Sequence, residues 1–451
     1  MGLFIFMMGY IVYFQMVRSK DIINSAYNTR QDAMADRVVR GQILDKDGNI
    51  LAKTNVGEDG SESREYPYGN MYAHVIGYST QGKAGLESVE NFNLLTSNAF
   101  ILERIFNELK DKKNIGDNVV TTLDTNLQEA AYDALGNNNG AVVVMEPGTG
   151  KILASVSKPD YDPNTVAVDW DSLNTSEDSV LLNRAMQGQY APGSTFKVVT
   201  TLEYMREYSD YSNYNFYCES SFSHAGTTIN CFQNESHGDE DLGASLANSC
   251  NASYSNIGLQ LDIGKFKTTA EELLFNKKLP SVLGSSKSKF TLSKDDSDAQ
   301  VMMTAIGQGD LQVSPYHMAL ITSAIANGGT LMKPYLVSSV NNYSGTEVLK
   351  NLPEKYGNLM TAAEAAQLTE YMKQTVEYGT ASSLGWRNYT VAGKTGTAEY
   401  SMDKTKTHSW FIGFSNVDNP ELVVSVIVES SDTAGTTATN VAGQIFDSYY
   451  N

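Results

Sequence analysis

One serine in the middle of the chain could act as a nucleophile, because a lysine follows it at a spacing suited to proton transfer. Ser194 and Lys197 lie in the stretch Ala-Pro-Gly-Ser-Thr-Phe-Lys, residues 191–197. Apolar residues recur at helical spacing after the serine, which predicts a helix over residues 195–205. Residues three apart share a helix face, so the amine would be close enough to hydrogen-bond the hydroxyl. A lysine whose pKa is lowered by burial can take that proton and activate the serine for acyl transfer.

Two shorter patterns downstream could complete such a site. Ser249 and Asn251 enclose a single residue, and residues 394–397 read Lys-Thr-Gly-Thr. The serine–lysine and serine–asparagine patterns each recur elsewhere in the chain, whereas Lys-Thr-Gly occurs only once. Because the first two patterns are not specific alone, the interpretation depends on the order of all three.

The three patterns, in this order, resemble the active-site motifs of penicillin-binding proteins and serine β-lactamases. Class B penicillin-binding proteins also carry an Arg-Gly-x-Ile-x-Asp-x-x-Gly stretch and a later Gly-Leu-Glu, which this chain matches at residues 40–48 and 85–87. The resemblance therefore spans nearly the whole chain. It implies a serine D,D-transpeptidase that cross-links peptidoglycan stem peptides ending in D-Ala-D-Ala, forms an acyl-enzyme on Ser194 and is a target of β-lactams.

The chemistry of acyl transfer suggests a role for each catalytic candidate. Lys197 would accept the proton of Ser194. Ser249 is suited to relaying that proton to the leaving amine. Asn251 can orient Lys197 and hydrogen-bond the substrate amide.

The Lys-Thr-Gly-Thr stretch suits substrate binding. Lys394 and Thr395, on an expected strand edge, would bind the carboxylate at the end of the substrate. Gly396 has no side chain, so we expect a substrate to lie close against this strand. The resemblance further implies that the backbone N–H groups of Ser194 and Thr397 form the oxyanion hole.

A histidine offers a rival mechanism, because a serine–histidine pair would make a conventional hydrolase. No Gly-x-Ser-x-Gly elbow surrounds Ser194, so we interpret His237 as a residue that structures its loop. The histidines and cysteines show none of the common metal-binding spacings, and we expect neither a metal nor a cofactor.

The three cysteines are too few for a disulfide scaffold. Cys218 and Cys231 lie in a polar region rich in serine and asparagine. A disulfide between them and two free surface thiols both remain open as interpretations. Cys250, inside the serine–asparagine pattern, is expected to pack as a small buried residue.

Strands and helices must hold these residues in place. Continuous apolar runs at residues 141–145 and 152–156 flank a Pro-Gly turn and predict a buried hairpin. Further strands are expected at residues 390–397, 410–414 and 422–428, the last two as antiparallel neighbours. Helices are expected between the hairpin and these strands, and again at residues 440–449. This pattern predicts an α+β domain, and the resemblance implies a penicillin-binding transpeptidase fold with helices on the sheet and a helical subdomain.

The chain divides into three expected parts: a membrane signal-anchor (1–20), an elongated pedestal or dimerisation-like domain (21–116) and a transpeptidase domain (117–451). Residues 3–17 are almost wholly apolar, which is short for a span of about 20 residues. Arg18 and Lys20 follow this stretch. Positive charges next to a span usually lie on the cytoplasmic side, so this order would leave the catalytic domain in the cytoplasm rather than outside it. A start site assigned too late would explain both features, and a buried core helix is the alternative. We expect a single-pass protein of the cell membrane.

Composition limits the partners. The chain has 451 residues and a net charge of −19, which argues against nucleic acid. The N-terminal region is too short for a glycosyltransferase domain, so the resemblance implies a separate membrane glycosyltransferase partner. A β-lactamase or D,D-carboxypeptidase of the same superfamily and a β-lactam-sensing receptor are the alternatives. The Glu-x-x-Leu-Asn stretch of class A β-lactamases is missing from the sequence.

Overall fold

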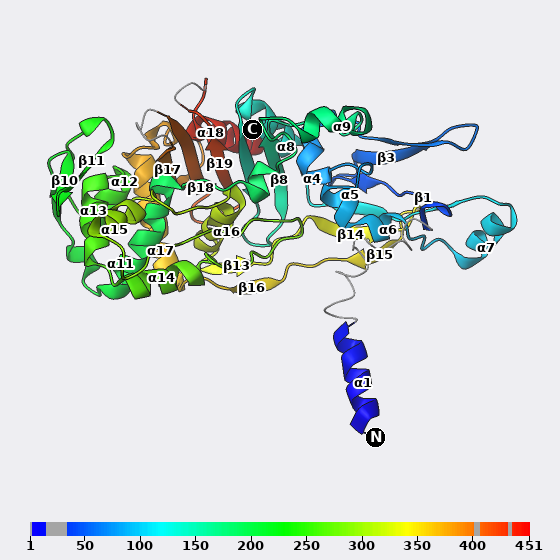
Figure 1. Cartoon of the computed structure of the whole chain (residues 1–451), viewed down its shortest axis with the longest axis horizontal. Helices are drawn as coiled ribbons and strands as arrows, with labels where there is room; N and C mark the ends of the chain where they lie inside the picture. Colours follow the sequence, from blue (N-terminus) through cyan, green and yellow to red (C-terminus); the bar gives the residue numbers. More distant parts are fainter. Residues whose placement is uncertain (1, 15–33, 401–405, 432–434) are drawn as a thin grey trace. The chain divides into compact units, whose positions relative to one another are not determined.

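The computed structural model describes residues 2–14, 34–400, 406–431 and 435–451 (Figure 1). The chain forms two compact units, each built from several segments. The first contains Met1–Leu123, Asp160–Leu181 and Val337–Leu352, and the second contains Asp124–Pro159, Leu182–Leu336 and Pro353–Asn451.

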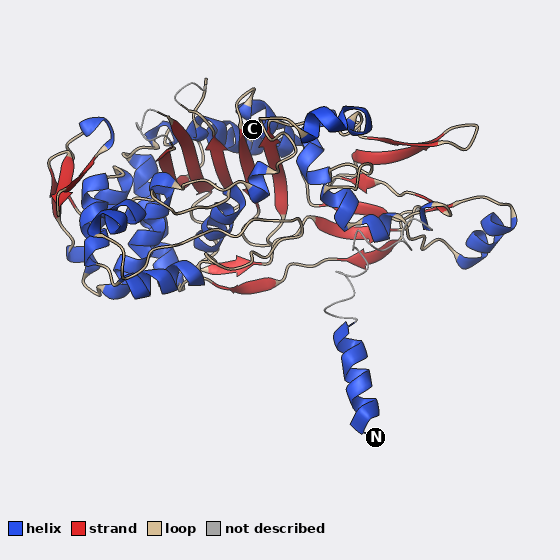
Figure 2. Cartoon of the chain, viewed as in Figure 1, coloured by secondary structure: helices blue, strands red, loops and turns tan. Residues whose placement is uncertain are grey.

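The second unit is organised around a five-stranded antiparallel sheet (Figure 2). Its strands, in spatial order, are β17 (Val391–Glu399), β18 (Thr407–Ser415), β19 (Leu422–Val428), β7 (Gly140–Met145) and β8 (Ile152–Lys158). The predicted hairpin is thus confirmed as β7 and β8, and the predicted antiparallel neighbours are β18 and β19. Every residue of β7, β8 and β19 is buried, as continuous apolar runs require when both faces of a sheet are covered.

Helices cover this sheet on both faces. Helices α8 (Thr125–Leu135) and α18 (Ala438–Tyr450) pack together and share one apolar core with β7, β8 and β19. Helix α16 (Pro315–Ala326) packs against β7, β18 and β19, and eleven of its twelve residues are buried. The expected α+β layering is therefore confirmed.

A helical subdomain of the second unit carries Lys197 and Asn251. Its helices are α11 (Lys197–Glu207), α12 (Leu242–Ala247), α13 (Asn251–Gln260), α14 (Ile263–Glu272), α15 (Asp298–Ala305) and α17 (Ala362–Glu377). Side-chain oxygens of Asp241, Asp262 and Ser297 cap α12, α14 and α15, and Thr361 and Glu364 form a capping box on α17. The unit also contains α10 (Arg184–Gln187) and the paired strands β13 (Thr330–Met332) and β16 (Lys355–Asn358).

The first unit is built on a six-stranded sheet. Its order is β15 (Glu347–Lys350), β14 (Val337–Asn341), β6 (Asn118–Thr121), β2 (Ile43–Leu44), β3 (Ile50–Val56) and β4 (Glu62–Glu65). Outside the sheet are α4 (Ala73–Ile76), α5 (Gly85–Val89), α6 (Asn91–Leu94), α7 (Ile101–Leu109), α9 (Val166–Asn174) and the paired strands β1 (Val38–Val39) and β5 (Asn114–Ile115). The chain re-enters this unit after the boundary expected between residues 116 and 117, because β14 pairs with β6.

A buried ionic cluster joins the two N-terminal sequence patterns. Glu87 is fully buried and accepts hydrogen bonds from Arg40 Nε at 2.6 Å and from Arg64 Nε at 2.7 Å. Burial alone would raise the pKa of Glu87, but the two guanidinium groups hold it below its ordinary value. The Arg-Gly and Gly-Leu-Glu patterns therefore meet in one charge-compensated contact inside the first unit.

Helix α1 (Gly2–Tyr13) is apolar, and none of its residues is buried. Within the described residues, no helix combines the length and the apolar character needed to cross a membrane. The remainder of the expected anchor, residues 15–20, lies outside the described residues.

Candidate active site

Ser194 lies in a short 3₁₀ turn, η3 (Gly193–Phe196), and α11 begins only at Lys197. The helix predicted over residues 195–205 therefore starts with a tighter turn. Thr195 Oγ1 closes this turn by donating to the Pro192 carbonyl at 2.8 Å. Trp410 Nε1 donates to the Ala191 carbonyl at 3.0 Å and ties the preceding residue to β18.

Two glycines bring the serine turn and β17 into direct contact. Gly193 has a φ of +54°, and a Cβ at this position would lie 2.5 Å from the Thr397 carbonyl oxygen. A Cβ on Gly396 would lie 3.0 Å from the Thr195 methyl and 3.1 Å from the Pro192 oxygen. Gly396 therefore makes room for the serine turn, and the expectation that a substrate lies close against this strand stays a prediction.

Lys197 is fully buried and is held by the serine–asparagine pattern. Its Nζ donates to the Ser249 carbonyl at 2.6 Å and to Asn251 Oδ1 at 2.7 Å, and lies 3.3 Å from Ser249 Oγ. Burial lowers the pKa of Lys197 to about 8, against a smaller opposing effect of Cys250 and Cys231. In the described part of the chain, the expected hydrogen bond between Lys197 Nζ and the Ser194 hydroxyl is not present.

The backbone around Ser249 explains how the two polar side chains reach Lys197. Ser249 adopts a left-handed conformation, with a φ of +57°, between α12 and α13. Such a conformation is strained for a residue with a Cβ and is typical of functional sites. Asn251 opens α13, and its Nδ2 donates to the Asn230 carbonyl at 3.0 Å, which fixes the amide with its oxygen toward Lys197.

Lys394 lies on the edge strand β17, as predicted, but its side chain is fully buried rather than solvated. Its Nζ donates to the Thr395 carbonyl at 3.0 Å. Burial holds the pKa of Lys394 well below its ordinary value, and the charge of Lys197 lowers it further. The half-exposed Thr395 forms a hydrogen bond through Oγ1 to Thr380 Oγ1 at 2.5 Å.

Thr397 presents its backbone to the serine turn. Its carbonyl faces Gly193 and accepts a hydrogen bond from Gln308 Nε2 at 3.4 Å, so it points away from β18. The N–H and C=O of one residue in an antiparallel strand point to the same side. The Thr397 N–H is therefore directed to the free edge of β17, beside Ser194.

Two residues near Lys197 were missed by the sequence analysis. The ring of Tyr254 lies 5.3 Å from Nζ, and its hydroxyl is 2.5 Å from Thr201 Oγ1. Glu240 is almost fully buried and is close enough to act on the pKa of Lys197. Tyr254 follows Asn251 by three residues on α13, so helical spacing could have identified it. No comparable signal pointed to Glu240.

The expectations for Cys218 and Cys231 were both wrong. The two sulfur atoms are 3.7 Å apart and not bonded, and both side chains are buried rather than on the surface. Cys250 is buried, as predicted.

Comparison with protein families gives two matches. The penicillin-binding protein transpeptidase domain matches residues 140–448. The penicillin-binding protein A dimerisation domain matches residues 40–119.

Individual relatives agree with these matches. The peptidoglycan D,D-transpeptidase PbpA of Mycolicibacterium smegmatis is 32% identical over 414 residues, covering 86% of this chain and 84% of the relative. The ceftriaxone acyl-enzyme complex of penicillin-binding protein A from M. tuberculosis superposes with a TM-score of 0.85 at 27% identity, over 93% and 100% of the two chains. A D,D-transpeptidase domain of a peptidoglycan glycosyltransferase from Eggerthella lenta superposes with a TM-score of 0.82 at 31% identity, over 92% and 98%.

Proposed function

Given that the chain belongs to the penicillin-binding protein transpeptidase family, we propose that it is a peptidoglycan D,D-transpeptidase with Ser194 as its nucleophile. One observation carries the residue assignment. A fully buried lysine, one turn from Ser194, is held by Ser249 and Asn251 and lies within the electrostatic reach of Lys394. The three sequence patterns therefore meet around Lys197.

Lys197 is suited to act as the base of the acylation step. A neutral amine has two hydrogens and one lone pair. The two shortest contacts of Nζ, to the Ser249 carbonyl and Asn251 Oδ1, use the hydrogens and leave the lone pair for the proton of Ser194. The serine oxygen then bonds to the carbonyl carbon of the penultimate D-Ala. The negative charge that develops on the carbonyl oxygen is received by the N–H groups of Ser194 and Thr397.

Collapse of this intermediate breaks the C–N bond to the terminal D-Ala. Ser249 Oγ, 3.3 Å from Nζ, passes the proton from Lys197 to the leaving amine. The product is an ester on Ser194. An amine from a neighbouring stem peptide attacks the ester carbon and loses its proton to Lys197, and the Ser194 oxygen is reprotonated as it leaves.

Lys394 and Thr395 are proposed to recognise the terminal carboxylate of the donor. The Thr395 hydroxyl is half-exposed on the edge strand and can donate to an anion. The side chain of Lys394 is buried next to Thr395, and its amine donates to the Thr395 carbonyl. Lys394 therefore supports the part of the strand that would bind the carboxylate. A β-lactam carries a carboxylate next to a strained amide and would occupy the same positions.

Labelling with penicillin tests the nucleophile. After incubation with a labelled penicillin, mass spectrometry of proteolytic peptides should find the penicilloyl group on the peptide that contains Ser194. Ser194→Ala should remove the label, whereas Ser155→Ala, which changes the serine of another Ser-x-x-Lys sequence, should retain it. Label on a peptide without Ser194 would contradict the proposal.

We also propose a membrane location and a membrane partner. The support is the apolar stretch at residues 3–17 and a family match confined to dimerisation and transpeptidase regions. The chain would be anchored once, with its catalytic unit outside the cytoplasm, beside a glycosyltransferase that supplies the glycan strand. Protease added to intact spheroplasts should digest the catalytic unit, and in-cell crosslinking should capture a membrane glycosyltransferase. Full protection from protease would contradict this location.

A further inference from the structure

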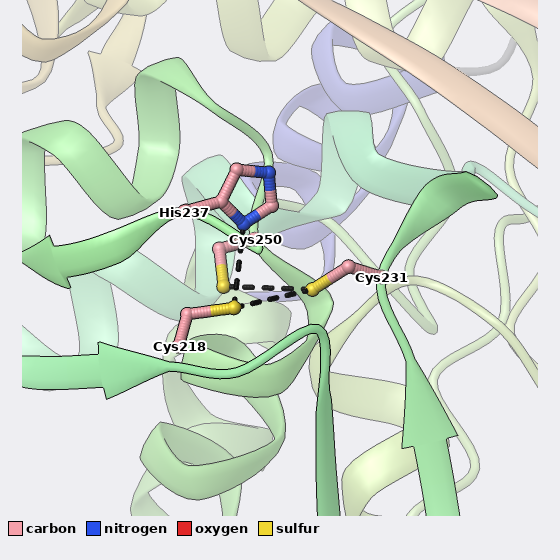
Figure 3. Close-up of side chains that lie close together, drawn as sticks. All are labelled: Cys218, Cys231, His237 and Cys250. Atoms are coloured by element: carbon pink, nitrogen blue, oxygen red, sulfur yellow. Dashed lines mark hydrogen bonds between the residues drawn. The ribbon is translucent and has the colours of Figure 1, made fainter. Parts of the chain in front are cut away.

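Four side chains that can bind a metal form a cluster, and one of them is the middle residue of the serine–asparagine pattern (Figure 3). The cluster consists of Cys218, Cys231, His237 and Cys250, whose ligand atoms all lie within 4.8 Å of one another. All three cysteines are buried and unbonded to one another, and the histidine is partly buried. No metal was expected from the sequence, because the spacings between these four residues match no common metal-binding motif.

Three distances in this cluster match those between ligands on one tetrahedral metal ion. Cys231 Sγ lies 3.7 Å from Cys218 Sγ and 3.7 Å from Cys250 Sγ, and His237 Nδ1 lies 3.4 Å from Cys218 Sγ. Two thiolates bound to zinc at about 2.3 Å are about 3.8 Å apart, and a thiolate and an imidazole nitrogen about 3.6 Å. A disulfide would instead require about 2.0 Å between the sulfurs.

The fold holds each ligand from a different short element. Cys218 ends β9 (Phe216–Cys218), which pairs with β12 (Gly238–Glu240), next to His237. Cys231 follows the hairpin of β10 (Ser221–His224) and β11 (Thr227–Asn230), and Cys250 caps α13. These strands belong to two-stranded sheets, and the sulfur atoms form the centre of their small core, with Phe216 and Phe222 around them. A two-stranded sheet is marginally stable by itself, and these strands depend on their packing against α13 and on this small core.

The surroundings favour thiolates. The backbone N–H of Ser253 donates to Cys250 Sγ at 3.3 Å, and the N–H of Ala252 donates to Cys231. Both groups belong to the first turn of α13, where the helix dipole also stabilises negative charge. Donors of this kind orient and stabilise thiolate ligands at metal centres.

We propose that Cys218, Cys231, His237 and Cys250 bind one structural Zn²⁺ ion. Three thiolates and one imidazole form a closed tetrahedral donor set, which is typical of structural zinc and leaves no open position for catalysis. Because Cys250 lies between Ser249 and Asn251, the ion would fix the backbone that positions these two residues on Lys197. Its role would be to position the site rather than to react.

Metal analysis of the full chain tests this proposal. The protein, produced with added zinc and purified without chelators, should retain about one zinc per chain after dialysis against metal-free buffer. His237→Ala should lose most of this zinc. His224→Ala is the matched control, since His224 lies in the same region but bonds to Asp298 instead of the cluster, and it should keep a full equivalent. Wild-type protein with less than about a tenth of an equivalent, or with a mapped disulfide between two of the cysteines, would overturn the proposal.

A cobalt titration covers the case in which His237→Ala does not fold. One equivalent of Co²⁺ added to zinc-free wild-type protein should produce the intense visible absorption of tetrahedral thiolate-bound cobalt, and zinc should displace it. Binding without that spectrum would overturn the tetrahedral thiolate site. Neither readout uses penicillin, so a failed zinc site and a failed transpeptidase assignment are distinguishable.

Discussion

Two buried lysines, Lys197 and Lys394, lie close to the turn that carries Ser194, and burial lowers the pKa of both. Burial lowers the pKa of Lys197 to about 8, and the pKa of Lys394 is also held well below its ordinary value, by burial first and then by the charge of Lys197. Two cations so close in a buried site disfavour each other, so at least one amine is neutral near neutral pH. Lys197 has the geometry of a base, because it lies one turn from Ser194 and is oriented by two acceptors.

The pH dependence of acylation follows from this pKa. A base must be unprotonated, and the neutral fraction of Lys197 rises with pH. The acylation rate by penicillin at subsaturating concentration should therefore rise up to about tenfold per pH unit below about pH 8 and then level off. Stopped-flow measurement with a fluorescent penicillin gives this profile.

The Lys197→Ala variant is the control for the pH profile. It should acylate about 10²–10⁴-fold more slowly, the usual contribution of general base catalysis, and without a rise toward pH 8. Wild-type acylation that stays constant over the same range, or a Lys197→Ala variant that matches the wild-type rate, would show that Lys197 is not the base.

At the scale of elements, the contact between η3 and β17 sets the position of the serine. Gly396→Ala would place a methyl group 3.0 Å from the Thr195 side chain and 3.1 Å from the Pro192 oxygen. The strand or the turn must then shift by a few tenths of an ångström. We expect acylation to slow by about tenfold or more, because small displacements of reacting groups are costly.

Gly357→Ala is the matched control for this substitution. Gly357 also lies in a strand, β16, and a Cβ there meets no atom within 4 Å. Its acylation rate should equal that of the wild type. If Gly396→Ala also acylates at the wild-type rate, with an unchanged thermal midpoint, the contact does not position Ser194.

The buried cluster of Arg40, Glu87 and Arg64 should be important for the stability of the first unit. Glu87→Ala leaves two guanidinium groups without their buried partner, which typically costs about 3–5 kcal/mol. We expect a lower urea midpoint and faster hydrogen exchange in α5 and β4. Glu65→Ala removes only the exposed partner of Lys53 and Asn55 and should change little. Equal midpoints for the two variants would show that the cluster does not stabilise this unit.

The sequence predicted elements well where burial follows from the residues themselves. The apolar runs of β7, β8 and β19 predicted buried strands, and these are buried throughout. Strands β9 to β12 were expected to be polar loop, since they are short and their core is made of cysteines rather than apolar side chains. The burial of Lys394 was missed for a similar reason. No local pattern distinguishes a solvated lysine on an edge strand from one covered by distant helices.

At the scale of the whole molecule, the lifetime of the acyl-enzyme separates a transpeptidase from a β-lactamase. Both are acylated on the same serine, but a β-lactamase needs a base that activates water. We expect a penicilloyl adduct that persists for many minutes to hours after free drug is removed, whereas a β-lactamase would turn over in well under about a second. Intact-protein mass spectrometry over time measures this decay. Rapid steady hydrolysis of a chromogenic cephalosporin without an accumulating adduct would favour the β-lactamase alternative.

The division into units depends on contacts that local sequence signals do not reveal. The sequence suggested one boundary between the pedestal and the transpeptidase domain, at residues 116 and 117, but the pairing of β6 with β14 joins residues far apart in the chain. The order of the motifs predicts the site residues for a different reason. Each motif is short and chemically constrained, so it can be read without knowledge of the contacts that bring the three together.

The late return of the chain to the first unit also sets an order of events during biosynthesis. Strand β6 ends at Thr121, but its partner β14 begins only at Val337. At about 5–20 residues per second, a ribosome needs tens of seconds to synthesise the intervening segment. Until then, β6 presents an unpaired edge on which strands of other nascent chains could dock. Strand β6 is therefore made well before β14 but completes its pairing only afterwards, and its edge needs protection in the interval.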